Sequence, residues 1–297
     1  MTLEELNKRI KTTTDLRDIV GTMKMLSSVS IGPYEKALKS LEEYGKTVWD
    51  AFAGLLKDDR FFYTPSRSKT ETPKTIAVVI GTDNGLVGRF NRDVLTFAKK
   101  DLTERNVMAD CSLICVGKRV GLIADSQKLS VAVTYPIMNS LKEIATIASM
   151  VLLKINELTA QNHFERVLVY YTHKQTGKPQ RVKVIQLMPL PQKEIQAMKQ
   201  AKWEGRTLPL ITSDREMLFT ALIHEYLTAV LGGALTASLA AEHYTRMINM
   251  QQAEKNIDES LEEMNLTYQQ LRQTGITDEL IDIVSGAESM KKKKNAA

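Results

Sequence analysis

All eight prolines of this 297-residue chain lie between positions 33 and 209, so the last part of the sequence contains none. Because an interior proline breaks a helix, a proline-free stretch of this length permits one uninterrupted helix. From Asp214 to about Val284 we expect a helix of roughly 70 residues, or about 105 Å at 1.5 Å per residue. Such a helix is longer than any domain that this chain could form, and it therefore needs a partner along its length.

The pattern within this stretch supports the prediction. Ser213 is expected to cap the helix and to form a capping box with Glu216, while Asp214 favours the helix dipole. Farther along, a 3,4 spacing that is typical of a coiled-coil seam continues for about three heptads. The seam consists of Met247, Met250, Glu254, Ile257, Leu261, Met264, Tyr268 and Leu271.

The N-terminal segment is predicted to supply the partner helix. Leu3, Leu6 and Ile10 form one apolar stripe, and a second stripe, offset at the threonines 12–14, consists of Leu16, Ile19, Met23 and Leu26. The helical pattern continues to about Leu56, although Gly32-Pro33 is expected to kink or interrupt it. Because the chain leaves along one helix and returns along the other, the pair is antiparallel. About 15 residues of the longer helix would project as a single helix, which usually docks into something.

The middle of the chain has a different sequence pattern. Short runs rich in Val and Ile alternate with amphipathic segments at 91–105 and 139–160, which predicts an α/β domain with a mostly parallel, Rossmann-like sheet. The expected strands are 74–81, 111–117, 129–136, 166–173 and 181–190. The last two are joined by a hairpin-sized loop, so one edge is expected to be antiparallel.

The predicted organisation is a two-helix stalk with this α/β domain inserted between its helices. The expected parts are an N-terminal coiled-coil helix at 1–60, a linker at 61–73, the α/β domain at 74–209, a C-terminal coiled-coil helix at 210–290 and a basic tail at 291–297.

Composition and charge exclude several classes of protein. Residues 61–213 carry 22 basic and 12 acidic side chains, but aromatic residues do not interleave with the basic ones, so nucleic-acid binding is not expected. No uninterrupted apolar run of about 18 residues predicts a membrane span, and the first residues do not resemble a signal peptide. Cys111 and Cys115 are predicted to be buried, reduced thiols.

The segment "TDNGLVGRFN" (82–91) is the one candidate for nucleotide chemistry. With Gly81, it places glycines at 81, 85 and 88, which fits neither G-x-G-x-x-G nor a Walker A loop, since Arg89-Phe90 follows Gly88. A structural strand–helix turn is therefore favoured over a phosphate site. The scattered histidines and the serines form no known catalytic or metal-binding pattern, so we expect no catalytic residue, metal or cofactor.

Several motifs together resemble those of the gamma subunits of rotary ATP synthases. They are "MKM" (23–25), "TDNGLVGRFN", "RMINMQQAEKNI" (246–257) and "LTYQQLRQTGITDELIDIVSGA" (266–287), and the resemblance covers almost the whole chain. The chain departs from the family pattern at Gly32-Pro33, at Val87 and Arg89, and in the terminal "KKKKNAA". It is therefore identified as a divergent member, and these departures are compatible with an alternative rotary ATPase.

The resemblance implies a central-stalk rotor subunit that couples transmembrane ion flow to ATP synthesis or hydrolysis and has no active site of its own. It implies as partners an alpha/beta catalytic hexamer, an epsilon subunit and a membrane rotor ring, in a peripheral complex on the cytoplasmic face of the energy-coupling membrane. The residues that match partner-contacting positions of the family are Met23, Lys24, Arg246, Arg272, Gln273, Thr277 and Glu279. The coupling ion, proton or sodium, does not follow from these motifs.

Two other hypotheses stay open from the residues alone. One is a nucleotide- or cofactor-binding α/β enzyme with a coiled-coil oligomerisation arm, and the other is a passive coiled-coil scaffold.

Overall fold

The structure is a computed structural model that describes residues 2–57, 73–137, 140–174, 180–200 and 210–294, with only the backbone for 287–294. Contacts divide the chain into two units, one made of residues 1–26 with 247–297 and the other of residues 27–246. Helices α1 (Leu3–Leu56) and α6 (Arg215–Lys294) each contribute to both units. The predicted linker at 61–73 lies outside the described residues except for its last position.

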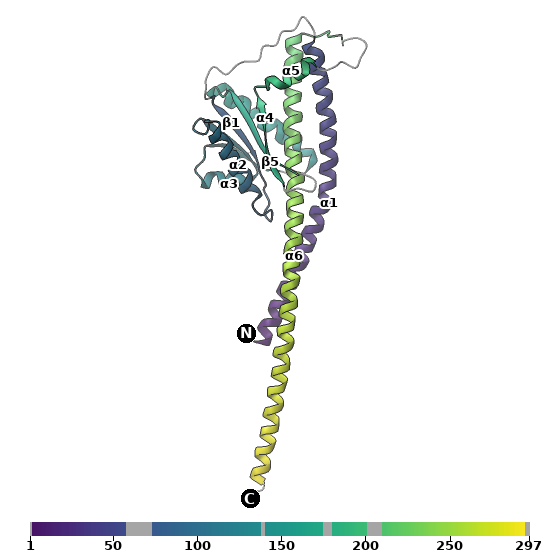
Figure 1. Ribbon diagram of the computed structural model, residues 1–297, viewed down its shortest axis with the longest axis vertical. Helices are drawn as coiled ribbons and strands as arrows, with labels where there is room; N and C mark the ends of the chain where they lie inside the picture. The colour runs from purple at the N-terminus through teal and green to yellow at the C-terminus, as the bar shows by residue number, and fades with distance from the viewer. Residues whose placement is uncertain (1, 58–72, 138–139, 175–179, 201–209, 295–297) are drawn as a thin grey trace. The chain divides into compact units, whose positions relative to one another are not determined.

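The larger unit is built on a five-stranded sheet with the strand order β3-β2-β1-β4-β5 (Figure 1). Four strands are parallel, and β5 runs antiparallel to β4 at one edge, as the hairpin-sized loop predicted. The strands are β1 (Thr75–Ile80), β2 (Cys111–Val116), β3 (Val131–Tyr135), β4 (Arg166–His173) and β5 (Arg181–Met188). All five predicted strands are therefore confirmed.

Helices cover both faces of this sheet. The predicted helices at 91–105 and 139–160 are confirmed as α2 (Phe90–Glu104) and α4 (Leu141–Asn162). The sequence reading missed two short helices, α3 (Lys118–Ser126) and α5 (Gln192–Gln200).

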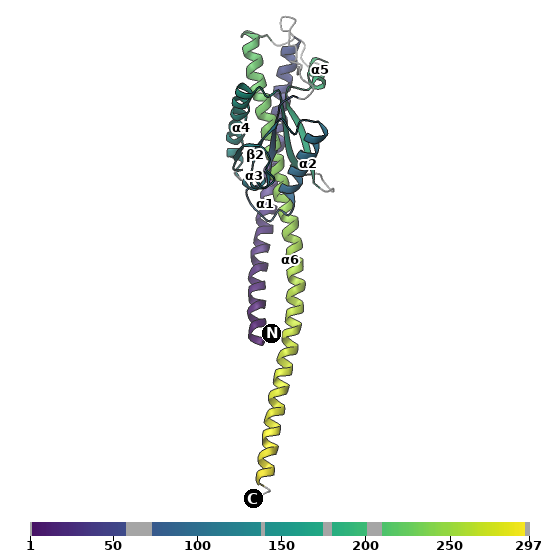
Figure 2. The ribbon, with the colours of Figure 1, turned by 90° about the vertical axis from the view of Figure 1, so that its left-hand side faces the viewer.

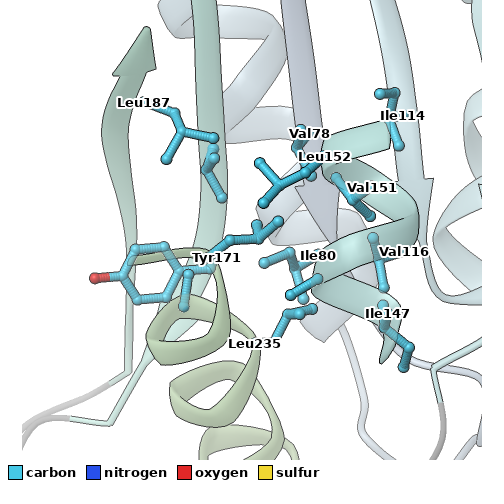
Figure 3. Packing of buried hydrophobic residues seen from close by; sticks show 14 of the residues in the cluster. Val78, Ile80, Ile114, Val116, Ile147, Val151, Leu152, Tyr171, Leu187 and Leu235 are labelled. Carbon is cyan, nitrogen blue, oxygen red and sulfur yellow. The ribbon is translucent and has the colours of Figure 1, made fainter. Parts of the chain in front are cut away.

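Because β1 is buried on both faces, every one of its six side chains is buried and none alternates with solvent. Val79 packs on the face covered by α2, in a cluster that also holds Cys111 and Cys115. Val78 and Ile80 pack on the opposite face against α4 and against Leu235 of α6 (Figure 3). The second face is thus the place where a stalk helix enters the core of the α/β domain.

The two cysteines are free and buried, as expected. Burial raises the pKa of each thiol to about 12, so both stay protonated at neutral pH.

The smaller unit consists of the first part of α1 beside the last part of α6, and both views show α6 continuing past the N-terminus of α1 (Figures 1 and 2). Thr2 and Glu5 form a reciprocal capping box at the start of α1, with N···O distances of 2.9 and 3.2 Å. The sequence reading did not identify this box.

Helix α1 is not interrupted where breaks were expected. The hydroxyls of Thr12 and Thr14 donate to the carbonyls four residues earlier, so these threonines fit within the helix. The predicted interruption at Gly32-Pro33 is also wrong, because the helix continues through Pro33. The neighbouring Ile31 and Tyr34 are buried in the larger unit, and their packing opposes the cost of the proline.

The start of α6 also differs from the prediction. The helix begins at Arg215, and the Asp214 carboxylate accepts a hydrogen bond of 2.9 Å from the backbone N–H of Met217. Asp214 is therefore the N-cap, and the predicted capping box of Ser213 and Glu216 is wrong. Asp214 combines the cap with a charge that favours the helix dipole, which explains why it serves better than the serine.

Candidate functional site: partner-binding surfaces

The glycine turn between β1 and α2 (81–91) is stabilised by hydrogen bonds to side chains of the same chain. The Asn91 amide accepts from the backbone N–H of Thr82 at 2.8 Å and donates to the Thr82 hydroxyl at 2.9 Å. The Asp83 carboxylate accepts from the backbone N–H of Lys118 at 2.6 Å and of Ile137 at 3.2 Å. A Cβ on Gly81 would lie 2.4 Å from the Asn91 side-chain oxygen, so this position requires glycine. These groups serve the architecture of the turn, as predicted for 82–91.

Helix α6 is fastened to this turn by Arg246. The Arg246 guanidinium donates to the Glu242 carboxylate at 2.5 Å and to the Gly85 carbonyl at 3.3 Å. Beside it, Val87 and Phe90 of the turn pack against Ala241. Arg246, predicted as a partner contact, thus already has two acceptors within its own chain and is only 8 % exposed.

A buried histidine adjoins this ion pair. His243 stacks on Tyr34 of α1, with ring centroids 5.3 Å apart, and neither of its ring nitrogens has a hydrogen-bond partner among the described residues. Burial, followed by repulsion from Arg246, lowers the pKa of His243 to about 4. Burial also raises the pKa of Glu242, although Arg246 opposes that shift.

The inward face of α1 in the smaller unit begins with apolar residues, of which Leu6 is fully buried, and continues with charged ones, where a second apolar stripe was predicted. Lys24 pairs with Glu254, and Arg17 pairs with Asp258 at 2.5 Å, so both cations face α6. The 3,4 spacing that starts at Leu3, Leu6 and Ile10 continues through positions 13, 17, 20, 24 and 27 without an offset.

The second predicted apolar stripe is therefore not the pairing face. Its members Leu16, Ile19, Met23 and Leu26 are 49, 54, 36 and 63 % exposed. Continuous spacing from Leu6, together with the opposite charges of Arg17 and Asp258, was the sequence signal that could have identified the correct face.

The seam of α6 agrees better with its prediction. Met250 is buried, and Ile257, Leu261 and Met264 are less exposed than the residues that flank them. Glu254 belongs to this seam because it pairs with Lys24, which explains the one charged residue in an otherwise apolar pattern.

Four of the predicted site residues gather on the last part of α6. Arg272, Gln273, Thr277 and Glu279 are all exposed, and the Thr277 hydroxyl donates to the Gln273 carbonyl at 2.9 Å. Large apolar side chains accompany them on the same stretch, namely Ile276, Leu280, Ile281, Ile283 and Val284, which are at least half exposed. A surface that mixes polar groups with large apolar ones is suited to a protein partner.

The seven predicted residues thus fall into three places. Met23 and Lys24 lie on α1 in the smaller unit, Arg246 lies in the larger unit, and the other four lie near the end of α6. Across the described part of the chain, no three or more His, Cys, Asp or Glu side chains come together in a way that could hold a metal ion.

Among the described residues, one helix, α6, contains a window that is long and apolar enough to cross a membrane. The core helices of soluble proteins pass the same test. The apolar residues Leu231, Leu235 and Leu239 of α6 are buried in the core of the larger unit, which accounts for much of this apolar character.

Comparisons with known proteins agree over nearly the whole chain. A protein-family model described as ATP synthase matches residues 2–290. The ATP synthase gamma chain of Staphylococcus saprophyticus is 26 % identical, covering 97 % of this chain and 99 % of the relative, and that of Acetivibrio thermocellus is 25 % identical with the same coverage. Among solved structures, a chain of the Euglena gracilis mitochondrial ATP synthase (OSCP/F1/c-ring) is similar with a TM-score of 0.64 at 18 % identity, covering 98 % of this chain and 95 % of that one. A chain of the Tetrahymena thermophila central stalk and c-ring has a TM-score of 0.55 at 19 % identity, covering 79 % and 99 %.

Proposed function

This chain belongs to the ATP synthase gamma family, and we propose that it is the central-stalk rotor subunit of a rotary ATP synthase. The observation that carries this proposal is the last part of α6, where exposed polar and apolar side chains share a helix that continues past the N-terminus of α1 (Figure 1). A single helix with these side chains is marginal in water and needs a surrounding protein surface.

The partners that we propose are an alpha/beta catalytic hexamer, an epsilon subunit and a membrane rotor ring. The similar Euglena chain comes from an assembly of OSCP, F1 and c-ring. In this proposal the chain is a non-catalytic subunit, and the complex is peripheral, on the cytoplasmic face of the energy-coupling membrane. The nucleotides are bound by the neighbouring subunits, which agrees with a glycine turn whose polar groups are engaged within the chain.

Rotation would act on the catalytic subunits as a ligand does. The stalk shifts the conformational equilibrium of each subunit only by the difference between its contact energies with the two conformations. Arg272, Gln273, Thr277 and Glu279 are proposed to make such contacts at the end of α6, and Met23 at the exposed side of α1. Lys24 would contact a partner only if it also kept, or exchanged, its pairing with Glu254. Arg246 would contact a partner only if it also kept, or exchanged, its pairing with Glu242.

The test uses the assembled complex with Arg272→Ala and Glu279→Ala in this chain. We expect assembly to persist and ATP-driven ion pumping to fall by several-fold relative to ATP hydrolysis. Lys142→Ala and Glu104→Ala are the controls, because both side chains are exposed in the α/β domain. Unchanged pumping in both α6 variants would favour the passive scaffold.

The enzyme alternative is tested separately. Calorimetric titration of the isolated chain with ATP and with NAD should give no saturable heat, and clear binding of either nucleotide would contradict the proposal.

A further inference from the structure

A cavity of about 360 Å³ lies within the larger unit, where α1, α6 and the β4–β5 edge of the sheet meet. Its apolar wall includes Leu38, Leu41, Tyr171, Ile185, Tyr226 and Val230. Figure 3 shows the Tyr171 ring beside α6, with its hydroxyl turned away from Ile80 and Val151. Tyr171 thus belongs both to the core cluster that contains Ile80 and to the wall of the cavity.

Glycine keeps this space open on both helices. Gly45 of α1 and Gly233 of α6 line the cavity, and a Cβ on either would meet no atom within 4 Å. Glycine in a helix interior costs about 1 kcal/mol relative to alanine. A Cβ atom would therefore fit at both positions, so crowding of the backbone does not require glycine there.

One cation, the exposed Lys183, lies on the sheet side of the cavity. Antiparallel pairing places Lys183 opposite Tyr171 and Arg181 opposite His173, and paired residues share one face of a sheet. Lys183 and His173 line the cavity, and the described residues provide no carboxylate within ion-pairing distance of Lys183. Burial, and then repulsion from Lys183, lowers the pKa of His173, so the positive charge of Lys183 acts on this side of the cavity.

One carboxylate also lines the cavity, on the side opposite the sheet. Glu42 lies on α1 at the cavity and raises the pKa of His173. Glu194 of α5 accepts a hydrogen bond of 2.7 Å from the Tyr226 hydroxyl and is thereby engaged. An apolar cavity with Lys183 at its sheet edge, where the described residues offer it no ion pair, suits a ligand with an apolar body and one negative charge that lies at the sheet and away from Glu42.

We propose that this cavity binds a small amphipathic carboxylate, with its hydrocarbon body between α1 and α6 and its carboxylate at Lys183. This site is separate from the surfaces that the proposed rotor function uses. Ligand binding is measured directly on the isolated full-length chain. A negative result would therefore contradict the ligand site and not the proposed rotor function, and the reverse also holds.

The experiment is a calorimetric titration with decanoate below its micelle concentration, compared with decanol and decylamine, which share its tail. We expect saturable binding of one decanoate per chain and weaker binding of the other two. Lys183→Met should weaken decanoate binding about tenfold, the loss of one charge-assisted hydrogen bond. Lys142→Met, which removes an exposed charge from α4, should leave it unchanged.

A second set of variants fills the cavity. Gly233→Leu should abolish decanoate binding without lowering the melting temperature, since leucine favours a helix more than glycine does. Gly275→Leu is the matched control, because that glycine also lies in α6 and a Cβ there would meet no atom within 4 Å, but it does not line the cavity. If Gly233→Leu does not fold, Gly45→Leu provides the same test from α1.

Three results would overturn the proposal. They are an absence of saturable decanoate binding, equal binding in Gly233→Leu, or tighter binding of decylamine than of decanoate. A Gly233→Leu chain that fails to join the assembled complex, together with no decanoate binding, would instead assign the cavity to a side chain of a partner subunit.

Discussion

The two units of this chain place their apolar residues in opposite ways. In the larger unit, all six side chains of β1 are buried, and Leu231, Leu235 and Leu239 of α6 pack into the same core. In the smaller unit, charged pairs occupy the inward face of α1 while Leu16 and Ile19 are about half exposed. The larger unit thus buries a continuous apolar core, although some of its apolar side chains, such as Leu122 and Leu153, are exposed. The smaller unit has no such core among its described residues and leaves most of its apolar side chains for a partner.

The largest loss of stability should come from breaking the buried ion pair of the larger unit, Arg246–Glu242. Arg246→Met leaves the buried Glu242 carboxylate without its partner and should lower the free energy of unfolding by about 3 kcal/mol. Urea unfolding followed by circular dichroism measures this loss. The loss should shrink as the pH falls, since Glu242 can then be protonated. A loss below about 1 kcal/mol at neutral pH would contradict the prediction, because it would be no larger than the loss from an exposed ion pair.

Truncation of a leucine should show the next largest difference. Leu235→Ala removes a fully packed side chain from the core and should cost about 3 kcal/mol, within the range for buried leucines. Leu26→Ala, at a side chain that is 63 % exposed, should change the stability of the isolated chain by less than about 0.5 kcal/mol. Equal melting temperatures for the two variants would contradict the contrast between the units.

Acid should weaken the larger unit through His243. Because its pKa is lowered to about 4 in the folded chain, stability is present above the unfolded pKa of 6.5 and is lost as the pH falls through 6.5 towards about 4. The loss amounts to at most about 3 kcal/mol from the size of the shift. Glu242, with its raised pKa, acts in the opposite sense, so the quantity to measure is the difference between the wild-type chain and His243→Phe from pH 7 to 4. Parallel stability curves for the two proteins would rule out a contribution of His243.

The smallest effect belongs to the ion pairs of the smaller unit. Lys24→Met removes the partner of Glu254, but both side chains are partly solvated, so the cost should be about 0.5 kcal/mol. Hydrogen exchange of the α1 amides reports this local change, which should disappear at about 1 M salt because screening shortens the range of the attraction. An effect that persists at high salt would show that Lys24 is held by packing of its hydrocarbon stem.

Strong local patterns made much of the fold predictable. The Val- and Ile-rich runs identified all five strands, and the absence of proline after 209 identified the long helix α6. Helix caps were less predictable where two neighbouring residues could both serve. Ser213 and Asp214 are both good caps, and only the folded chain showed that Asp214 accepts the hydrogen bond.

The candidate site shows the same division. The motifs near the end of α6 identified Arg272, Gln273, Thr277 and Glu279, and the structure leaves all four exposed, while their contacts with a partner remain a prediction. The contact of Arg246 with Gly85 was not predicted, because Gly85 is far from Arg246 in the sequence. The pairing with Glu242 has i,i+4 spacing, so the sequence did contain a signal for it that was missed.

By itself, the sequence determined the five strands and the long helices of this protein, its antiparallel sheet edge and its family, since these depend on local periodicity, turn residues and motif order. The tertiary structure decided which face of α1 points inward. Leu16 and Ile19 have the spacing of a seam as much as Leu6 and Ile10 do, but the helix continues through its threonines without an offset. Arg17 and Lys24 thereby meet Asp258 and Glu254, and the side chains of Leu16 and Ile19 turn outward. The physical reason is that the spacing of apolar residues indicates a helix, whereas the face of the helix that becomes buried depends on the element that packs against it.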